Sequence, residues 1–433
     1  MMDPSFVAVA GFVALFTLML LRFPIGLAMG AVGVAGFAAL VGVEPAMKLL
    51  AQSPIRTATD AGFAVIPLFL LMGTIASASG MSGELFQAAN SFLGHRKGGL
   101  GMATIAACAG FAAISGSSVA TAATFSAVAY PEMRRFNYPQ SFSTGVIAAG
   151  GTLGAILPPS LVLAVYSLIT QQDVGKLYMA GIIPGLLAVL MYVTTIWVIG
   201  RVRPGFLPRG PRAGWSERLA AVRGVWAITL LFLFVIGGMY GGAFTPTEAA
   251  SMGAGGAFLI AVLRGRLSPA MFLDCLLRAL RTSAAIFAIL IGALLFGYFL
   301  TITQTPQHVT EFLTGLGLGR YHVLLLIMLM YLVLGCVMDA MAMVILTIPI
   351  IFPVITALGF DPIWFGVIIV MTVELGLIHP PVGMNVFVIK SVVRDVRIGT
   401  IFVGVIPFVI TDIIRLAILI AFPILSTFLP EHM

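Results

Sequence analysis

The sequence predicts an all-α membrane protein built from two halves that are related by an inverted-topology repeat. Three observations predict this fold class. Of the 433 residues, 60% are apolar and only 9% are charged, and the mean hydropathy is +1.11. Apolar runs of about 20 residues, long enough to cross a bilayer, recur along the chain. Several motifs of the first half return in the second half, displaced by 222 residues.

The composition excludes a soluble globular protein, because the surface of such a domain needs about one quarter charged residues. The bilayer is therefore the expected solvent. The net charge of +7 does not indicate nucleic-acid binding, because most Lys and Arg lie between apolar runs, where they set orientation.

Cys108, Cys275 and Cys336 have no CxxC or His spacing, so neither a disulfide nor a metal centre is expected. The first apolar run follows no basic segment and is interpreted as a retained span rather than a signal peptide.

Ten apolar segments are expected to cross the membrane. Their boundaries lie near residues 5–21, 24–43, 62–79, 141–169, 178–200, 225–243, 247–263, 283–302, 363–389 and 400–429, the last including an interfacial part.

Residues 100–130 and 323–355 do not fit this scheme. Each is too long for one upright helix across a core of about 30 Å and too short for two spans with a turn. Each also has a polar or small centre, at 115–118 and 335–339. We expect two re-entrant helical hairpins whose tips are covered by protein or line a water-filled cavity. The alternative is one long tilted helix in each region.

Counting Lys and Arg along the threaded chain predicts the orientation. One side collects 18 of them and the other collects 4, with Arg415 inside the last span. Because cytoplasmic loops are the more basic, the protein is expected in the bacterial inner membrane, with both termini in the periplasm. The expected parts are a first repeat at 1–200, a cytoplasmic linker at 201–224 and a second repeat at 225–433.

The strongest repeated motif is L-G-x-I-x-P-P, at 153–159 and again at 375–381. Three further pairs follow the same displacement in the same order: Phe23-Pro24 with Thr245-Pro246, Tyr130-Pro131 with Phe352-Pro353, and Asp173-Val174 with Asp395-Val396. Each half holds five crossings and one hairpin, so the second half enters from the opposite side. Inverted repeats of this kind are common among secondary transporters, which bind substrate and ions at broken helices near the midplane.

The paired prolines predict where the helices break. Proline lacks an N–H group and disfavours helix in the preceding residue, so the spans 141–169 and 363–389 are expected to be interrupted. The N-terminus of a half-helix can bind a carboxylate, and carbonyl groups at an unwound C-terminal end can bind Na⁺. The substrate candidates are Ser117, Pro158, Ser160, Pro380 and Asn385.

Asp339 lies at the centre of the second hairpin, where Ser117 lies in the first. An ionisable side chain at that depth is a functional candidate, here as part of a Na⁺ site; the alternative is a helix cap. Glu374 and His379 flank the second break. We interpret His379 as an adjustable hydrogen-bonding group rather than a proton relay. Asp412 and Arg415, three residues apart, are expected to form a structural pair on one helical face.

The motifs together resemble one family. They are Phe23-Pro24-Ile25-Gly26, the Ser115-Gly116-Ser117-Ser118 hairpin followed by Tyr130-Pro131-Glu132-Met133, Gly150-Gly151-Thr152-Leu153-Gly154, Thr245-Pro246-Thr247-Glu248 and Pro380-Pro381-Val382-Gly383-Met384-Asn385. From end to end, the chain resembles the large membrane subunit, of the DctM type, of the tripartite ATP-independent periplasmic (TRAP) transporters.

The resemblance implies an elevator-type secondary transporter that imports an organic acid, such as a C4-dicarboxylate or sialic acid, with Na⁺ as the coupling ion and no other cofactor. It also implies two partners, a small membrane subunit of about four spans and a periplasmic substrate-binding protein. The family's first Na⁺ site falls on Ser115, Gly116, Ser117, Ser118 and Thr121 with Gly150, Thr152 and Gly154. Its second falls on Gly335, Asp339, Thr372, Glu374 and Gly376.

Other readings are weaker. A single-component sodium/dicarboxylate symporter of the same architecture is the nearest. The chain has no GxxxxGK[ST] motif, so in an ATP-driven system it would serve only as the permease. A membrane-embedded enzyme would need a nucleophile with a base, or a metal cluster, and only Glu374 with His379 comes near. A channel would not need two paired hairpins that close on one site.

Overall fold

The computed structural model describes residues 3–315, 317–336 and 338–432. In these ranges the regular structure is helical, apart from an isolated antiparallel bridge between Lys97 and Arg209, which confirms the predicted fold class. Within them, seven helical stretches are individually long and apolar enough to cross a bilayer. These stretches are 61–78, 140–170, 174–202, 246–263, 269–302, 340–357 and 398–421. Shorter apolar helices accompany them.

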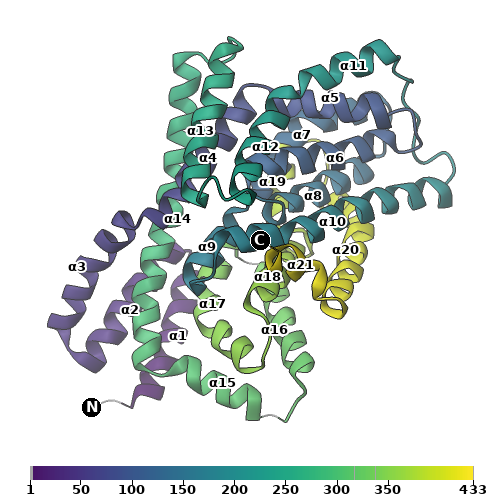
Figure 1. The fold of residues 1–433 in the computed structure, drawn as a ribbon. Helices are drawn as coiled ribbons and strands as arrows, with labels where there is room; N and C mark the ends of the chain where they lie inside the picture. The colour runs from purple at the N-terminus through teal and green to yellow at the C-terminus, as the bar shows by residue number, and fades with distance from the viewer. Residues whose placement is uncertain (1–2, 316, 337, 433) are drawn as a thin grey trace.

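One group of helices, called here the scaffold body, lies at the left of Figure 1 and reaches its centre. It comprises α1 (Pro4–Leu20), α2 (Ile25–Val41), α3 (Val43–Thr59), η1 (Ala61–Ala64), α4 (Val65–Ala78), α12 (Trp226–Tyr240), α13 (Pro246–Leu263) and α14 (Pro269–Ile302). The backbones of α2 and α14 touch where Gly26 faces Gly292. Small residues allow such close packing between membrane helices.

The other group, called here the hairpin body, lies to the right of it. It comprises α6 (Gly99–Ser115), α7 (Ser118–Arg135), α8 (Gln140–Ile156), α9 (Leu161–Thr170), α10 (Val174–Val202), α16 (Arg320–Gly335), α17 (Ala340–Ala357), α18 (Pro362–Ile378), α19 (Met384–Val392) and α20 (Ile398–Ala421). Helices α8 and α18 form its centre, and almost all of their residues are buried.

Two short helices connect the bodies: α5 (Met81–Leu93) links α4 to α6, and α15 (Thr305–Gly315) links α14 to α16. Near the start of α5, Glu84 forms ion pairs with Arg264 and Arg266 in the loop between α13 and α14. Helix α11 (Trp215–Gly224) packs on α5, and α21 (Ile424–Glu431) packs on α10.

The helix boundaries repeat at the displacement of 222 residues. Helices α7 and α17 both have 18 residues, α8 and α18 both have 17, and in each pair the boundaries match position by position. One region departs from this symmetry. The single α14 of 34 residues occupies the positions that α3, η1 and α4 share in the first half.

Both long regions are broken at their polar centres, so the alternative of one continuous tilted helix is wrong. Helix α6 ends at Ser115 and α7 begins at Ser118, while α16 ends at Gly335 and α17 begins at Ala340. Within the second tip, residue 337 lies outside the described residues.

Two predicted boundaries need correction. The segment expected from 283 belongs to a helix that begins at Pro269, because Asp274, Arg278 and Arg281 interrupted the apolar run that we followed. The segment 400–429 is two helices, since α20 ends before Pro423 and α21 follows it.

Candidate functional site

Four helix N-termini converge in the hairpin body. A cavity of about 80 Å³ is lined by residues at the starts of α7, α9, α17 and α19 and by Leu377 near the end of α18. The residues at the helix starts are Gly116, Ser117, Ser118, Val119, Leu161, Val162, Asp339, Ala340, Met341 and Met384. Two of these helices follow the hairpin tips, and the other two follow the paired prolines. The free N–H groups and the helix dipole make each such end favourable for an anion.

Side chains of the sequence-predicted residues shape these helix starts. Ser117 caps α7 by accepting a hydrogen bond from the backbone N–H of Ala120, at 3.3 Å. Ser160 caps α9 by accepting one from Leu163, at 3.2 Å. Asp339 caps α17, with Oδ1 accepting from the N–H groups of Met341 and Ala342, at 2.9 and 3.1 Å.

The first hairpin tip lies directly on the first break. The N–H of Leu161 donates to the carbonyl of Gly116, at 3.2 Å. A Cβ placed on Gly154 would meet the Ser117 carbonyl oxygen at 2.6 Å, so only glycine fits there. The Ser115 and Thr121 hydroxyls lie 3.0 Å apart. The structure therefore places Gly154 against the hairpin tip, whereas Gly150 faces Cys108 of α6 and the side chain of Thr152 is directed away from the tip.

Thr152 points elsewhere. Its hydroxyl lies 2.7 Å from the Ala149 carbonyl oxygen and 3.0 Å from the Tyr192 hydroxyl on α10. Tyr192 in turn donates to Asp412, which forms the expected buried ion pair with Arg415, at 2.8 Å. The Thr152 side chain thus belongs to a polar network between α8, α10 and α20 rather than to the hairpin tip.

The second hairpin meets the second break at two glycines. A Cβ on Gly335 would lie 2.9 Å from the Cα of Gly376, and the reverse also holds. The backbones are therefore in contact, which leaves carbonyl oxygens as the available ligands. The Thr372 hydroxyl donates to the carbonyl of Ile368 in its own helix, at 2.8 Å. Pro380 accepts a weak hydrogen bond from the Cys336 thiol, at 3.6 Å.

Two buried polar side chains near the breaks lack partners among the described residues. Glu374 is 2% exposed, and among the described residues its carboxyl oxygens have no well-formed hydrogen bond, although the Ser118 side chain lies nearby. Asn385, at the start of α19, is fully buried with both amide atoms unpaired. Unsatisfied buried polar groups are rare because each costs free energy. A bound ion or substrate would satisfy them, so both residues stay candidates.

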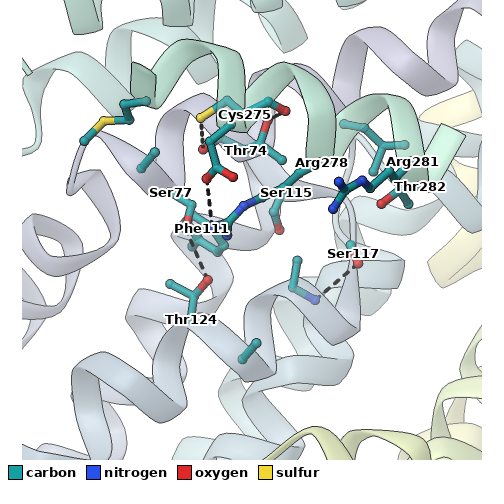
Figure 2. A pocket seen from close by; sticks show the side chains of 17 residues that line it. Thr74, Ser77, Phe111, Ser115, Ser117, Thr124, Cys275, Arg278, Arg281 and Thr282 are labelled. Atoms are coloured by element: carbon teal, nitrogen blue, oxygen red, sulfur yellow. Dashed lines mark hydrogen bonds and ion pairs between the residues drawn. The ribbon is translucent and has the colours of Figure 1, made fainter. Parts of the chain in front are cut away.

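A larger cavity of about 640 Å³ separates α14 from the first hairpin (Figure 2). Its lining includes Ser77 of α4, Ser115 and Ser117 of the hairpin, and Arg278 and Arg281 of α14. Ser117 also lines the smaller cavity. Figure 2 shows both guanidinium groups extending from α14 toward this space.

The arginines differ in their partners. Arg278 is paired with Asp274, at 2.8 Å, whereas Arg281 forms no ion pair with any described residue. From the sequence, both arginines are interpreted only as charges that set orientation, and neither is predicted to line a binding site. Their spacing of three residues near the start of a long apolar segment was the available signal, because it places them on one helical face.

No group of three or more His, Cys, Asp or Glu side chains that could hold a metal ion occurs in the described part of the chain. The oxygen atoms at the breaks are carbonyl, hydroxyl and carboxyl groups, which suit a hard cation.

Comparison with known proteins identifies relatives. Residues 12–425 match the family described as "Tripartite ATP-independent periplasmic transporter, DctM component". A C4-dicarboxylate TRAP transporter large permease protein of Pseudomonas aeruginosa is 37% identical over 404 residues, covering 92% of this chain and 93% of that protein. An isethionate TRAP transporter permease protein named DctMQ, of Oleidesulfovibrio alaskensis, is 33% identical, covering 97% of this chain and 64% of that protein.

Solved structures resemble the fold. Neisseria gonorrhoeae MtrF, described as an antimetabolite efflux pump, superposes with a TM-score of 0.56 at 14% identity, covering 88% of this chain and 84% of that chain. At that identity the likeness concerns the fold alone.

Proposed function

Because the chain belongs to the DctM family of tripartite ATP-independent periplasmic (TRAP) transporter components, we propose that it is the large permease subunit of a Na⁺-coupled importer of a C4-dicarboxylate or a related organic acid. The substrate class comes from the relatives' names and from the chemistry of the site.

The observation that carries the proposal is the convergence of four helix N-termini on one small cavity. Such ends stabilise negative charge through free N–H groups and aligned peptide dipoles. One carboxylate of the substrate would bind there, between Ser117 and the start of α19. Asn385, buried without a partner, would donate from its amide group.

Arg281 is suited to bind the other end of the substrate. It lines the larger cavity, shares that cavity with Ser117, and has no acidic partner among the residues that the structure describes. Guanidinium groups pair with carboxylates through two parallel hydrogen bonds. A dicarboxylate would therefore span from the helix ends of the hairpin body to α14 of the scaffold body.

Coupling to Na⁺ is supported by the oxygen atoms at the two breaks. The first site would use carbonyl and hydroxyl oxygens of the tip from Ser115 to Thr121, together with 150–154. The second would use carbonyl oxygens near Gly335 and Gly376. A cation near Glu374 would offset the cost of burying that carboxyl group without a partner.

An elevator motion fits the division into two bodies. The cavity with Arg281 lies between them, and α5 and α15 connect them. In the orientation predicted from charge, this cavity adjoins the cytoplasmic end of α14, so the described state would face inward. The family works with a small membrane subunit and a periplasmic binding protein, and we propose both as partners of this chain.

Reconstitution tests the proposal. Liposomes containing this chain, the small subunit and the binding protein should accumulate a labelled C4-dicarboxylate only with an inward Na⁺ gradient. In the same assay Arg281→Gln should raise the KM for a dicarboxylate about tenfold, the loss expected for one charge-assisted contact. Robust uptake by this chain alone would instead favour the single-component symporter. Uptake independent of Na⁺ would overturn the coupling.

A further inference from the structure

A separate cavity lies where three segments far apart in the sequence meet. These segments are the turn at 94–98, the C-terminal end of α10 and the linker at 208–210. The cavity, called here the basic pocket, has a volume of about 600 Å³. It is lined by His95, Arg96, Lys97, Met102, Trp197, Gly200, Arg201 and Arg209.

The charged side chains that line the basic pocket are all positive. Arg96, Lys97, Arg201 and Arg209 contribute four positive charges, and no acidic residue lines the cavity. Within the described ranges, none of these four side chains forms an ion pair. Several other basic residues do: Arg134 pairs with Asp395 and Arg264 with Glu84.

Membrane orientation alone does not explain this arrangement. The positive-inside effect requires basic residues on one side of the membrane, but it does not require them to surround one cavity. Here two hydrogen bonds to backbone carbonyl groups hold the linker in place. The N–H of Gly210 donates to the Gly94 carbonyl, at 2.9 Å, and the Tyr138 hydroxyl donates to the Pro208 carbonyl, at 2.8 Å. The linker is therefore fixed against the turn, and the four charges are held close together.

An apolar track on α10 leads to the basic pocket. Leu186, Leu190 and Trp197 are 58%, 64% and 51% exposed, and their spacing places them on one face of the helix. At the end of this face the Arg201 guanidinium stacks on the Trp197 ring, 5.0 Å from its centre. Tryptophan is typical of the boundary between the lipid core and water.

We propose that the basic pocket binds the headgroup phosphate of an anionic phospholipid, whose acyl chain lies along Leu186, Leu190 and Trp197. The charges select a phosphate without a compensating cation, as in phosphatidylglycerol or cardiolipin, rather than a zwitterionic headgroup. The exposed apolar face selects a lipid over free phosphate. The bound lipid would join α10 to the turn and the linker, and this role is independent of the transported substrate.

The test uses the purified full-length chain, delipidated in a neutral detergent. Phosphatidylglycerol should raise the unfolding temperature and remain bound in native mass spectrometry, whereas phosphatidylcholine at the same concentration should do neither. In Arg201→Gln/Arg209→Gln the phosphatidylglycerol concentration for half-maximal effect should rise at least about tenfold, because two of the four positive charges that attract the phosphate are removed.

Two further variants separate binding from folding. Arg201→Lys/Arg209→Lys keeps the charges and should retain most of the effect. Arg223→Gln/Arg397→Gln removes two exposed arginines outside the basic pocket and should behave as the parent protein. An equal effect of phosphatidylcholine, or an unchanged response of the double glutamine variant, would overturn the proposal. An equal effect of inorganic phosphate would show a soluble anion site instead of a lipid site.

Discussion

The carboxyl group of Asp339 has a structural role beside its candidate role in ion binding. One of its oxygens caps α17, as the alternative reading expected, while the residue also lines the cavity between the two hairpin tips. A cap accounts for one oxygen and does not need a negative charge, because asparagine caps helices equally well. The charge therefore remains available for an ion, and the two roles can be separated by substitution.

Asp339→Asn should keep α17 capped and lose the charge. We expect the Na⁺ concentration for half-maximal uptake to rise about tenfold or more, or uptake to be lost, while assembly with the small subunit persists. The matched control is Asp361→Asn, because Asp361 caps α18 by accepting from Trp364, at 2.7 Å, and does not line this cavity. Unchanged Na⁺ dependence in Asp339→Asn would leave that residue as a cap only.

The contact between Gly335 and Gly376 gives a second test at single-residue scale. Gly335→Ala should force α16 away from α18, since its new Cβ would lie 2.9 Å from a backbone atom, and such overpacking typically costs about 1–3 kcal/mol. We expect a lower unfolding temperature and a smaller Na⁺-dependent increase in that temperature.

Gly297→Ala is the control for this substitution, because a Cβ there meets nothing within 4 Å. It should leave stability unchanged or raise it by up to about 1 kcal/mol, as expected for alanine in a helix. If both variants respond to Na⁺ as the parent does, the glycine contact does not shape an ion site.

Single residues were predicted unevenly from the sequence. Gly154 meets Ser117, and Gly335 meets Gly376, because motifs at helix breaks restrict which backbones can approach each other. The direction of the Thr152 side chain was not predictable, since it depends on Tyr192 forty positions away. Arg281 was not predicted as a candidate for substrate binding, because a basic residue near a membrane boundary is already explained by its effect on the orientation of the protein in the membrane.

At the scale of elements, the paired prolines predicted both breaks because the chemistry of proline is local. The amphipathic α3, α5 and α15 were not predicted. Their apolar residues follow one helical face instead of forming a continuous run, so a search for 20-residue apolar segments passes over them. The start of α14 was missed for a related reason, since charged residues facing a cavity interrupt its apolar run.

Helix α5 is held to the scaffold body by Glu84. Burial raises the pKa of this carboxyl group, but hydrogen bonds and charge from Arg264 and Arg266 outweigh burial, and its pKa lies below the ordinary value of 4.5. The folded state therefore binds this proton less readily than the unfolded state. Its contribution to stability is complete above pH 4.5 and is lost as the pH falls through the lowered pKa.

Glu84→Gln should lower the free energy of unfolding by about 1–2 kcal/mol at neutral pH. The difference from the parent should shrink below pH 4.5, where the parent also becomes protonated. Thermal unfolding of both proteins across this pH range measures the effect. Glu44→Gln is the control, because the pair of Glu44 with Lys48 is 80% and 70% exposed and should contribute little. A constant difference at all pH values would contradict the ion-pair explanation.

The orientation of the whole molecule is testable with cysteine labelling in intact cells. Ser216→Cys, in the exposed part of α11, should resist a membrane-impermeant thiol reagent until the cells are permeabilised. Glu431→Cys should react at once. Cys108 and Cys275 are buried, and only Cys336, which is half-buried, needs replacement to remove background. The reverse labelling pattern would invert the predicted orientation.

The symmetry between the halves fails at one place, and the failure restricts how the molecule can change shape. In the first half the helix is interrupted at Asp60, between α3 and η1, where the Asp60 side chain accepts a hydrogen bond from the backbone N–H of Gly62, at 2.8 Å. The equivalent position, Thr282, lies inside the continuous α14. The two halves therefore cannot fully exchange conformations, because α14 would have to break its backbone hydrogen bonds to adopt the conformation of α3 and α4. In the proposed elevator motion the scaffold body therefore stays unchanged, and any exchange of conformation between the halves is confined to the hairpin body.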